Sequence, residues 1–216
     1  MGLMPRDALL NDINPHLINF YQWLRRGSLS PSIQMVNSEE LFYENRERFN
    51  GLLDRGEEQS SEAAALFYYL NRTGYNGLCR FNQSGRFNVP FGKYRSIAYV
   101  RDVSPYRKAF RNWRFAVEDF EGLELLDSDF VYADPPYDVE FTQYSKGGFS
   151  WEDQVRTAEW LSKQKGPVAV SNQATDRIIK LYKKLGYSVQ FLKGRRLISC
   201  NGDRTPALEV LATRNL

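Results

Sequence analysis

Asp127-Ser-Asp-Phe-Val-Tyr-Ala-Asp134-Pro135-Pro136-Tyr137 is the stretch that decides the fold. Its apolar run from Phe130 to Ala133 predicts a buried parallel strand, with acidic residues before it and a double proline after it. The prolines cannot continue a strand or a helix, so Asp134 stands at the carboxyl end of the strand. In open α/β sheets, ligands bind at that edge.

The tetrapeptide from Asp134 to Tyr137 has the groups of a small hydrogen-bonding and stacking site. The Asp134 carboxylate and the Pro135 carbonyl accept hydrogen bonds, and Tyr137 offers a flat face. Such a site suits an exocyclic amino group on a planar base. An Asp-Pro pair also makes an ordinary helix N-cap followed by a loop, and this stretch alone leaves that alternative open.

Size and composition bound the class of protein. The 216 residues, 42% of them hydrophobic, can bury one sizeable core and a small second lobe. The chain has no run of 18 apolar residues, and its start has no basic-then-apolar pattern, so we expect neither a membrane span nor a signal peptide. The two cysteines, Cys79 and Cys200, favour a reducing cytoplasm over a disulfide framework. With His16 as the only histidine, we expect no metal site.

Basic residues concentrate between Arg72 and Arg114. Aromatic residues are interleaved with them, and Asp102 is the only acid of the segment. This composition is typical of a nucleic-acid-binding surface, and the alternative is a solvated basic face beside an aromatic cluster. The ten basic residues are Arg72, Arg80, Arg86, Lys93, Arg95, Arg101, Arg107, Lys108, Arg111 and Arg114.

The order of the predicted elements indicates an α/β fold. Strand patterns alternate with amphipathic helix patterns, which predicts a mostly parallel sheet with helices on both faces. Asn14 and Pro15 predict a helix start, with His16 as an exposed polar residue, and the turn at 82–85 indicates a hairpin. We expect strands at 8–12, 115–118, 130–133, 167–171, 187–192 and 207–213, and helices from 14, over 38–70, 151–165 and 175–185. Within 38–70, helix-start signals stand at Ser38 and again at Ser60-Ser61-Glu62.

Several stretches of the chain resemble the Dam family of DNA adenine methyltransferases, the D12 class. Besides the Asp134 tetrapeptide they are Asn14-Pro-His-Leu-Ile-Asn-Phe-Tyr21, Asn71-Arg-Thr-Gly-Tyr-Asn-Gly-Leu-Cys-Arg80-Phe-Asn82, Phe87-Asn-Val-Pro-Phe-Gly-Lys-Tyr94, Phe141-Thr-x-Tyr144, Ser171-Asn172 and Arg196-x-Ile-Ser-Cys-Asn-Gly. The resemblance covers nearly the whole chain. It implies a Rossmann-like methyltransferase fold with residues 1–37 and 107–216 as the catalytic domain and 38–106 as a helical and hairpin target-recognition insert.

The resemblance also implies an activity and its residues. The family transfers a methyl group from S-adenosylmethionine to adenine N6 in double-stranded DNA, usually in 5′-GATC, after flipping the base out. Carried over by position, the catalytic residues are Asp134, Pro135, Pro136 and Tyr137. Asp12 is similar to the acid that holds the cofactor ribose, and Asp119 and Phe120 resemble the pair beside the cofactor adenine, with Asp134 also on the cofactor side. The implied DNA-binding residues are Arg72, Tyr75, Asn76, Leu78, Arg80, Pro90, Lys93, Tyr94 and Arg95, among which Tyr75 resembles the aromatic residue that enters the base stack.

The same motifs bear on which atom of a base accepts the methyl group. The tetrapeptide alone does not separate adenine N6 from cytosine N4, so an N4-cytosine methyltransferase remains the lesser alternative. Cytosine C5 methylation uses a Pro-Cys nucleophile, whereas Leu78 precedes Cys79 and Ser199 precedes Cys200 here. We expect a protein of the bacterial or phage-infected cytoplasm, associated with the nucleoid. Restriction-linked, regulatory and phage roles all stay open.

The chain departs from the family at its start. The family normally begins with a Phe-x-x-x-Gly-x-Lys segment and a strand ending in Phe-x-Gly-x-Gly, and residues 1–11 contain only Gly2. The sequence therefore predicts a sheet without its central first strand, which favours homodimer formation. Three explanations stay open: an N-terminally truncated enzyme, an active variant that binds the cofactor differently or takes the strand from a partner, and a catalytically impaired DNA-binding remnant.

Overall fold

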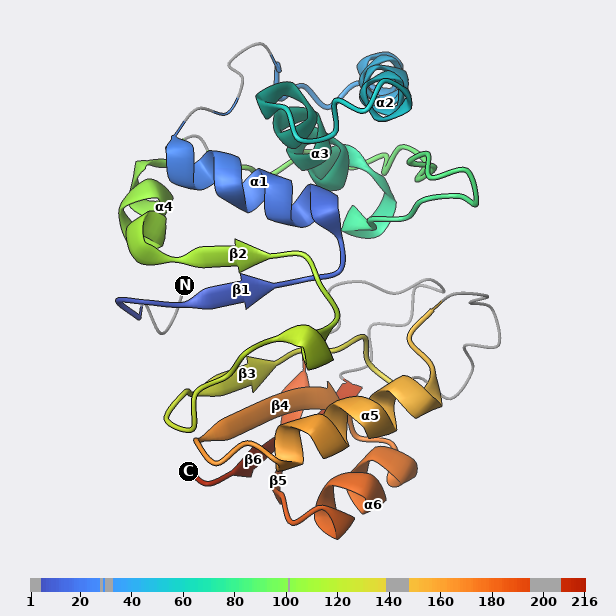
Figure 1. Ribbon diagram of the computed structural model, residues 1–216. Helices are drawn as coiled ribbons and strands as arrows, with labels where there is room; N and C mark the ends of the chain where they lie inside the picture. The colour runs from blue at the N-terminus through green and yellow to red at the C-terminus, as the bar shows by residue number, and fades with distance from the viewer. Residues whose placement is uncertain (1–4, 28, 30–32, 101, 139–147, 195–206) are drawn as a thin grey trace. The chain divides into compact units, whose positions relative to one another are not determined.

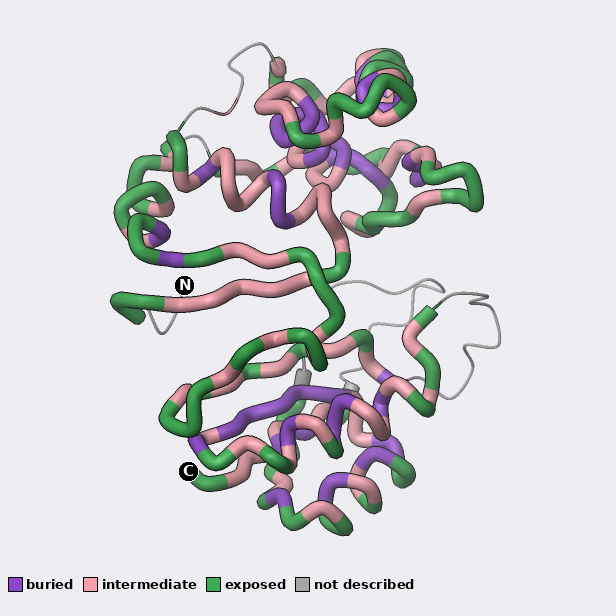
Figure 2. The backbone as a smooth tube through the Cα atoms, in the orientation of Figure 1, coloured by how far each residue is buried: buried purple, intermediate pink, exposed green. Residues whose placement is uncertain are grey.

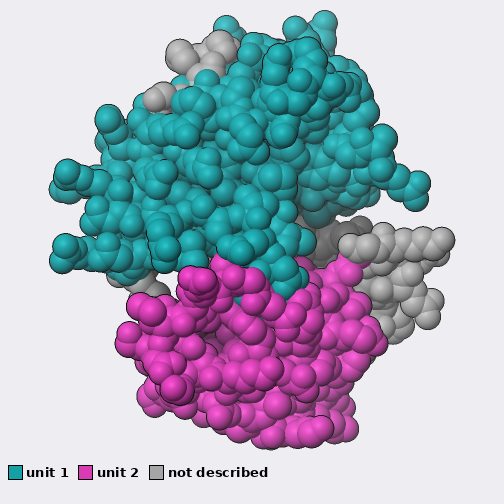
Figure 3. All heavy atoms as spheres, viewed as in Figure 1, with its two compact units in different colours: residues 1–120 teal, residues 121–216 magenta. Residues whose placement is uncertain are grey.

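The computed structural model describes residues 5–27, 29, 33–100, 102–138, 148–194 and 207–216. The chain forms two compact units, unit 1 at residues 1–120 and unit 2 at residues 121–216, coloured teal and magenta in Figure 3. The contacts divide the chain at residue 120 and do not test the boundaries of the predicted insert, so the insert at 38–106 stays a prediction. Two stretches of the resemblance, 141–144 and 196–202, lie outside the described residues.

Among its described residues, unit 1 combines a small parallel sheet with four helices (Figure 1). Strands β1 and β2 pair in parallel, with Leu9 opposite Arg114 and Asn11 opposite Ala116. The elements are β1 (Leu9–Asn11), α1 (Pro15–Arg26), α2 (Glu39–Asp54), α3 (Ser61–Thr73), α4 (Ser104–Ala109) and β2 (Arg114–Ala116), with short 3₁₀ turns at Tyr75–Gly77 and Phe110–Asn112. The predicted helix over 38–70 is therefore two helices, separated where the second start signal at Ser60 stands.

Local capping explains where the helices of unit 1 begin. The Asn14 side chain accepts hydrogen bonds from the backbone of His16 and Leu17, and Pro15 occupies the first helical position. Ser38 and Ser60 cap α2 and α3 in the same way. These three starts are confirmed as predicted. They are readable from sequence because the donors and acceptors lie within three residues of one another.

The core of unit 1 joins the helices to the segment that follows α3. Helix α3 is buried along most of its length, as Figure 2 shows. Phe87 and Val89, which come from the predicted hairpin, are buried in the same cluster. Full burial of such a side chain contributes about 1.5–3 kcal/mol. The cluster also contains Phe42, Phe49, Leu52, Ala63, Leu66, Phe67, Tyr69 and Leu70.

His16 is half-buried, so its prediction as an exposed polar residue was wrong. Its ring stacks on Phe81 at 4.8 Å between centroids and meets the edge of Phe49 at 5.4 Å. Its Nδ1 atom is buried without a hydrogen-bond partner among the described residues. Burial lowers the pKa of His16, and the charge of Glu58 opposes this. The residues next to His16 in the sequence could not predict its burial, because its aromatic partners come from distant parts of the chain.

In the part of unit 2 that the structure describes, a mixed sheet packs with two helices (Figure 1). The strand order is β3-β4-β6-β5. Strands β3 and β4 are parallel, whereas β6 runs antiparallel to both β4 and β5. The elements are β3 (Val131–Ala133), α5 (Trp151–Ser162), β4 (Val168–Gln173), α6 (Asp176–Lys184), β5 (Ser188–Gly194) and β6 (Ala207–Arg214), with a 3₁₀ turn at Phe120–Gly122.

The predicted mostly parallel sheet with helices on both faces needs correction for unit 2. The apolar pattern of a strand does not set its direction, and β6 inserts antiparallel between β4 and β5. Helices α5 and α6 both cover the face that carries Val168, Val170 and Val210. Among the described residues, unit 2 therefore has one helix-covered face. In the part of the chain that is described, no helix is long and apolar enough to cross a membrane.

The strand before the double proline is at an edge of its sheet and is more exposed than predicted. Val131 to Ala133 pair with Val168 to Val170 of β4, so the predicted parallel pairing is confirmed. However, Phe130 and Tyr132 are 47% and 55% exposed. The reason is that β4 is the only neighbour of β3 in the described sheet, and Tyr132 points away from the helix-covered face.

We expect the stability of the protein to depend on pH through His16. The folded-state pKa is lower than that of the unfolded chain, so stability is full above the ordinary histidine pKa of about 6.5. It declines as the pH falls below that value and levels off below the folded-state pKa. In His16→Phe, which keeps a stacked ring, the fall in Tm between about pH 7.5 and about pH 5.5 should be smaller. Equal falls in both proteins, measured by thermal denaturation, would contradict this.

Candidate active site and nucleic-acid interface

Two parallel strands bring Asp134 and Ser171 together. Ala133 of β3 lies opposite Val170 of β4, so the residues that follow them emerge at the same edge of the sheet. The Ser171 hydroxyl donates a hydrogen bond of 2.6 Å to Asp134 Oδ1. The Tyr132 hydroxyl lies 3.1 Å from Ser171 Oγ. The Asp134 carboxylate is therefore oriented by a hydroxyl group at the strand edge where a ligand is expected.

Two buried amide side chains hold the backbone of the tetrapeptide. Gln154 of α5 donates a hydrogen bond of 2.6 Å to the Pro136 carbonyl. Asn172 of β4 accepts one of 2.9 Å from the Asp138 backbone and donates another of 2.9 Å to Gln154 Oε1. Asn172 and Gln154 are only 0% and 3% exposed. Buried amides have to be paired to avoid a desolvation cost, so this arrangement selects one conformation for the tetrapeptide.

Asp138 anchors the end of the tetrapeptide. Thr175 Oγ1 and Arg177 Nε each donate a hydrogen bond of 2.7 Å to Asp138 Oδ2, and Arg177 Nη2 bonds Oδ1. Burial raises the pKa of Asp138, but the hydrogen bonds from Arg177 and Thr175 and the charge of Arg177 outweigh it, so the net shift is downward. The guanidinium of Arg177 also lies 4.7 Å from the ring centroid of Trp151.

The phenol of Tyr137 remains neutral at physiological pH. Partial burial raises its pKa, and the nearby Asp134, Glu209 and Tyr132 raise it further, against the hydrogen bond from Ser171. The predicted stacking residue is thus an uncharged aromatic surface beside Asp134. Gln154 and Asp138 were not predicted from sequence. For Gln154, the one signal in the sequence was that it is a polar residue among the apolar positions of the α5 helix pattern.

A second predicted group lies at the carboxyl edge of the sheet in unit 1. Asp12 follows β1 and accepts a hydrogen bond of 2.7 Å from the Asn14 backbone, which leaves its carboxylate at the start of α1. Asn11 forms two hydrogen bonds with the backbone of Glu118, at 2.9 and 3.2 Å. These bonds tie the loop that contains Asp119 and Phe120 to the end of β1. Unit 1 therefore contains Asp12, Asp119 and Phe120, three of the four residues that the resemblance assigns to the cofactor.

These residues fit one half of the expected cofactor. A carboxylate at a strand end suits ribose hydroxyls, and the Asp119–Phe120 pair supplies a polar group and a ring for an adenine. The resemblance assigns the methionine half to a glycine-rich strand end, and Gly2 is the only glycine in residues 1–11. The described residues therefore support an adenosine-binding edge.

The basic segment after α3 forms the predicted hairpin. Gly74 pairs with Phe91 and Phe81 pairs with Phe87 in antiparallel bridges. The turn closes where the Gly85 backbone donates to the Asn82 carbonyl at 3.0 Å. These are isolated bridges rather than regular strands. The hairpin prediction is confirmed in its turn and its pairing.

The predicted wedge residue sits on a special turn of the hairpin. Tyr75 is exposed, and its backbone donates to the Pro90 carbonyl at 2.8 Å. Asn76 has a φ of 54°, in the left-handed region that asparagine tolerates better than most residues. Asn71 donates to the Gly77 carbonyl at 2.7 Å and closes this turn. The structure thus places Tyr75 and Pro90 side by side.

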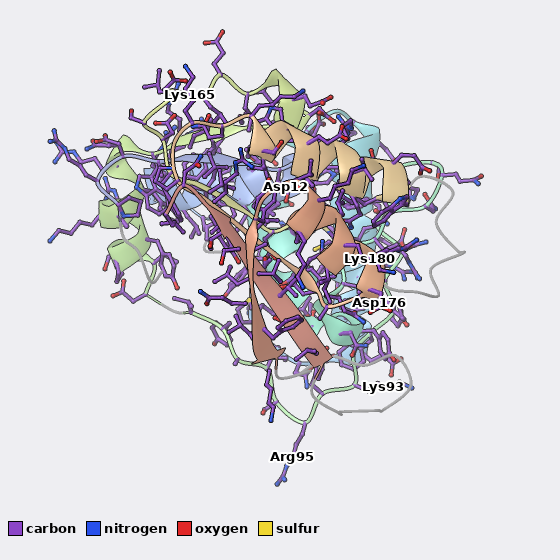
Figure 4. All side chains as sticks on the ribbon, turned by 90° about the horizontal axis from the view of Figure 1, so that it is seen from below. Asp12, Lys93, Arg95, Lys165, Asp176 and Lys180 are labelled. Carbon is purple, nitrogen blue, oxygen red and sulfur yellow. The ribbon has the colours of Figure 1, made fainter. Side chains whose placement is uncertain are left out.

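The other predicted DNA-binding residues lie on the same segment. Leu78, Arg80, Lys93, Tyr94 and Arg95 are exposed. Figure 4 shows Arg95 extending away from the ribbon. Arg72 is less available, because its Nε donates to the Ala98 carbonyl at 2.6 Å. The predicted DNA-binding residues are therefore gathered on the hairpin of unit 1, whereas the predicted catalytic residues belong to unit 2.

The described cavities and acids point to no additional centre. A shallow cavity of about 320 Å³ is lined by residues of α5 and the turn before β3, and it includes none of the predicted site residues. We attach no function to it. Within the described ranges, no three histidine, cysteine or acidic residues form a cluster that could hold a metal ion. The cavity is lined by Glu121, Trp151, Glu152, Val155, Arg156, Glu159, Trp160 and Lys163.

Comparison with known proteins decides the family. The model of the D12 class N6 adenine-specific DNA methyltransferases matches residues 3–197. The chain belongs to this family. It is 34% identical over 219 residues to the retron Ec67 DNA adenine methylase of Escherichia coli, covering 94% of this chain and 74% of that protein. It is 36% identical over 227 residues to the DNA adenine methylase of Vibrio cholerae, covering 94% and 78%.

A third relative is the DNA N-6-adenine-methyltransferase of Escherichia phage P1. It is 33% identical over 215 residues, which cover 92% of this chain but only 28% of that longer protein. The family assignment confirms the resemblance stated from the sequence motifs, and it makes the chain a DNA adenine methyltransferase by descent. The roles of individual residues remain predictions.

Removing the cation that pairs with Asp138 should destabilise the protein. Arg177→Ala leaves a carboxylate that is 5% exposed without its main partner. Loss of one partner of a fully buried pair costs about 3–5 kcal/mol, and we expect about 1–2 kcal/mol here. The smaller value reflects an Arg177 side chain that is 48% exposed. Urea denaturation would measure it.

Two control variants match this prediction: one replaces Arg177 with a different residue, and the other replaces a lysine of the same helix. Arg177→Lys keeps the charge but loses the two-point geometry, so we expect an intermediate loss of stability. Lys180→Ala removes an exposed cation from α6 and should change little. An Arg177→Ala protein as stable as Lys180→Ala would show that the pair contributes nothing.

Proposed function

We propose that the protein transfers a methyl group from S-adenosylmethionine to N6 of adenine in duplex DNA, with 5′-GATC as the target. The observation that carries the proposal is the Asp134–Tyr137 tetrapeptide, held by Gln154, Asn172 and Asp138 in a single conformation. Its acceptors and its ring match an exocyclic amino group on a planar base. The family membership supports adenine as that base.

The residues of unit 2 act by positioning and electrostatics. The Ser171 hydroxyl orients the Asp134 carboxylate through Oδ1, and the carboxylate and the Pro135 carbonyl each accept one N6 hydrogen. These two hydrogen bonds direct the nitrogen lone pair out of the ring plane and toward the methyl donor. Tyr137 stacks on the adenine ring. With the cofactor bound, the N6 nitrogen would bond to the methyl carbon as the carbon–sulfur bond of the sulfonium breaks and the neutral thioether leaves. N6 would release one proton to solvent, without a covalent enzyme intermediate.

Duplex DNA hides N6, so the adenine has to leave the base stack. Flipping costs a few kcal/mol of unstacking. Tyr75 is exposed on the tight turn beside Pro90, where it can enter the gap in the stack. Arg80 is the candidate reader of a guanine through its O6 and N7 atoms, a contact worth about 1–3 kcal/mol of discrimination. The exposed Lys93 and Arg95 supply phosphate contacts.

Three of the four proposed cofactor residues, Asp12, Asp119 and Phe120, belong to unit 1, and Asp134 belongs to unit 2. When bound, S-adenosylmethionine supplies an electrophilic methyl group. Asp12 accepts hydrogen bonds from the ribose hydroxyls, and Asp119 and Phe120 hold the adenine of the cofactor. The Asn11 bonds to the Glu118 backbone keep this loop beside the end of β1.

The proposal predicts that the Asp134 carboxylate is needed for methyl transfer but not for binding the duplex. Asp134→Ala should lower tritiated-methyl transfer to a GATC duplex by at least about a hundredfold, as expected when a transition-state hydrogen-bond acceptor is lost. Duplex affinity should stay within about twofold, because Asp134 is not among the predicted DNA contacts. Asp127→Ala, an exposed acid of the same stretch paired with Lys165, is the control and should retain activity.

Calorimetry with S-adenosylmethionine distinguishes the alternatives. Cofactor binding together with methyl transfer that depends on Asp134 supports the proposed enzyme. Duplex binding that weakens with salt, without cofactor binding, would instead identify a DNA-binding protein without catalysis. Full activity in Asp134→Ala would overturn the proposed site. Transfer to cytosine in place of adenine would favour the N4 alternative.

A further inference from the structure

Arg80 and Asn88 are cross-strand partners in the hairpin. The Asn88 backbone donates to the Arg80 carbonyl at 3.1 Å. In the opposite direction, Arg80 Nη2 donates to the Asn88 carbonyl at 3.3 Å, and Arg80 Nε donates to Asn88 Oδ1 at 2.9 Å. Three hydrogen bonds therefore connect two residues, and one of them uses the Asn88 side chain.

These bonds occupy one edge of the Arg80 guanidinium. A guanidinium has five N–H groups in a planar fork. Asn88 takes the edge formed by Nε and one hydrogen of Nη2. Three N–H groups remain, and two of them, one on Nη1 and one on Nη2, form the end of the exposed Arg80 side chain. That pair has the spacing that guanine O6 and N7 accept.

Asn88 itself is held from behind by helix α2. Asn50, which is 2% exposed, donates to the Phe87 carbonyl at 3.1 Å and accepts from the Phe87 backbone at 2.7 Å. Arg46 donates to the Val89 carbonyl at 3.4 Å. Both neighbours of Asn88 are thus fixed to α2.

An ion-pair cluster secures the same strand one residue further back. Arg86 pairs with Glu47 at 2.9 Å and also with Asp54, both on α2. Phe87 and Val89 are buried in the helical core of unit 1. The strand that carries Asn88 therefore cannot shift without disrupting the core.

We propose that Asn88 is a specificity-determining positioning residue, which presents the end of the Arg80 guanidinium to guanine. This inference rests on the proposed function. Arginine has many rotamers, and ordering it on binding opposes association. Asn88 orders it beforehand. The contribution of Asn88 therefore passes through Arg80 and is expressed in base discrimination rather than in general DNA affinity.

The test is equilibrium binding of the full chain to fluorescent duplexes, measured by anisotropy at one fixed salt concentration. One duplex contains GATC, and the others have a single G·C pair of the site replaced. Discrimination is the ratio of the two dissociation constants. Arg80→Ala should lower discrimination at one G·C pair by about tenfold or more. Asn88→Ala should lower it at the same pair by about three- to tenfold.

A double substitution separates positioning from direct contact. In the Arg80→Ala background, Asn88→Ala should cause no further loss of discrimination, because its effect requires Arg80. Asn88→Asp retains an acceptor for Nε and should retain discrimination, even if its negative charge weakens overall DNA binding. Gln83→Ala, which removes an exposed amide from the same hairpin, is the control and should leave both quantities unchanged.

Five results would overturn the inference. Additive losses in the double variant would mean that Asn88 contacts DNA itself. Equal weakening on all duplexes would mean a merely structural role, and loss of discrimination in Asn88→Asp would exclude the acceptor as the cause. A wild-type chain that binds every duplex equally would instead refute the proposed target recognition together with this inference. Normal wild-type discrimination that is unaltered in Asn88→Ala would refute the inference alone.

Discussion

The hydrogen bonds of the fully buried Asn172 side chain are the interaction on which the geometry of the Asp134–Tyr137 tetrapeptide depends. The side chain satisfies the Asp138 backbone and Gln154 at once, and it also donates to the Tyr182 hydroxyl. An amide in an apolar core is stable only when its partners are all in place. Strand β4, helix α5, helix α6 and the tetrapeptide are therefore restricted to one mutual arrangement. Burial raises the pKa of Tyr182 to about 12, so this partner remains neutral as well.

In unit 1, the helices hold the backbone of the hairpin in place. A hairpin without regular strands has few backbone bonds of its own, and the helices supply the rest. Asn50 takes the place of a neighbouring strand for Phe87, and aromatic side chains of the hairpin complete the core of α2 and α3. The rings of His16 and Phe81 extend this packing to the first turn of α1. The exposed residues of the hairpin are thus free to contact a partner, because others hold the backbone.

Sequence reasoning succeeded where cause and effect lie close together in the chain. The caps at Asn14, Ser38 and Ser60, the turn at 82–85 and the placement of Asp134 after a strand all depend on neighbouring residues. The resemblance supplied the family, which the comparisons confirm.

What sequence reasoning missed depends on contacts between distant residues. Arg177 pairs with Asp138 across 39 positions, and Asn50 meets Phe87 across 37. The exposure of Tyr132 and the antiparallel direction of β6 follow from which strands become neighbours. A local apolar run predicts that a strand forms, but it does not predict how many neighbours the strand will have. The same limit explains His16, whose burial is determined by aromatic partners from three other segments.

The burial of Phe87 and Val89 in the helical core has a consequence for folding cooperativity. Local opening of a protein usually proceeds through segments with few buried contacts. The strand from Arg86 to Val89 is excluded from that class, because releasing it would expose the core and break its bonds to α2. Its amide protons should therefore exchange with solvent as slowly as those of α3, while the turn at 82–85 exchanges quickly. The segment from Arg86 to Val89 therefore forms a single cooperative unit with helices α2 and α3, and it opens only when they do.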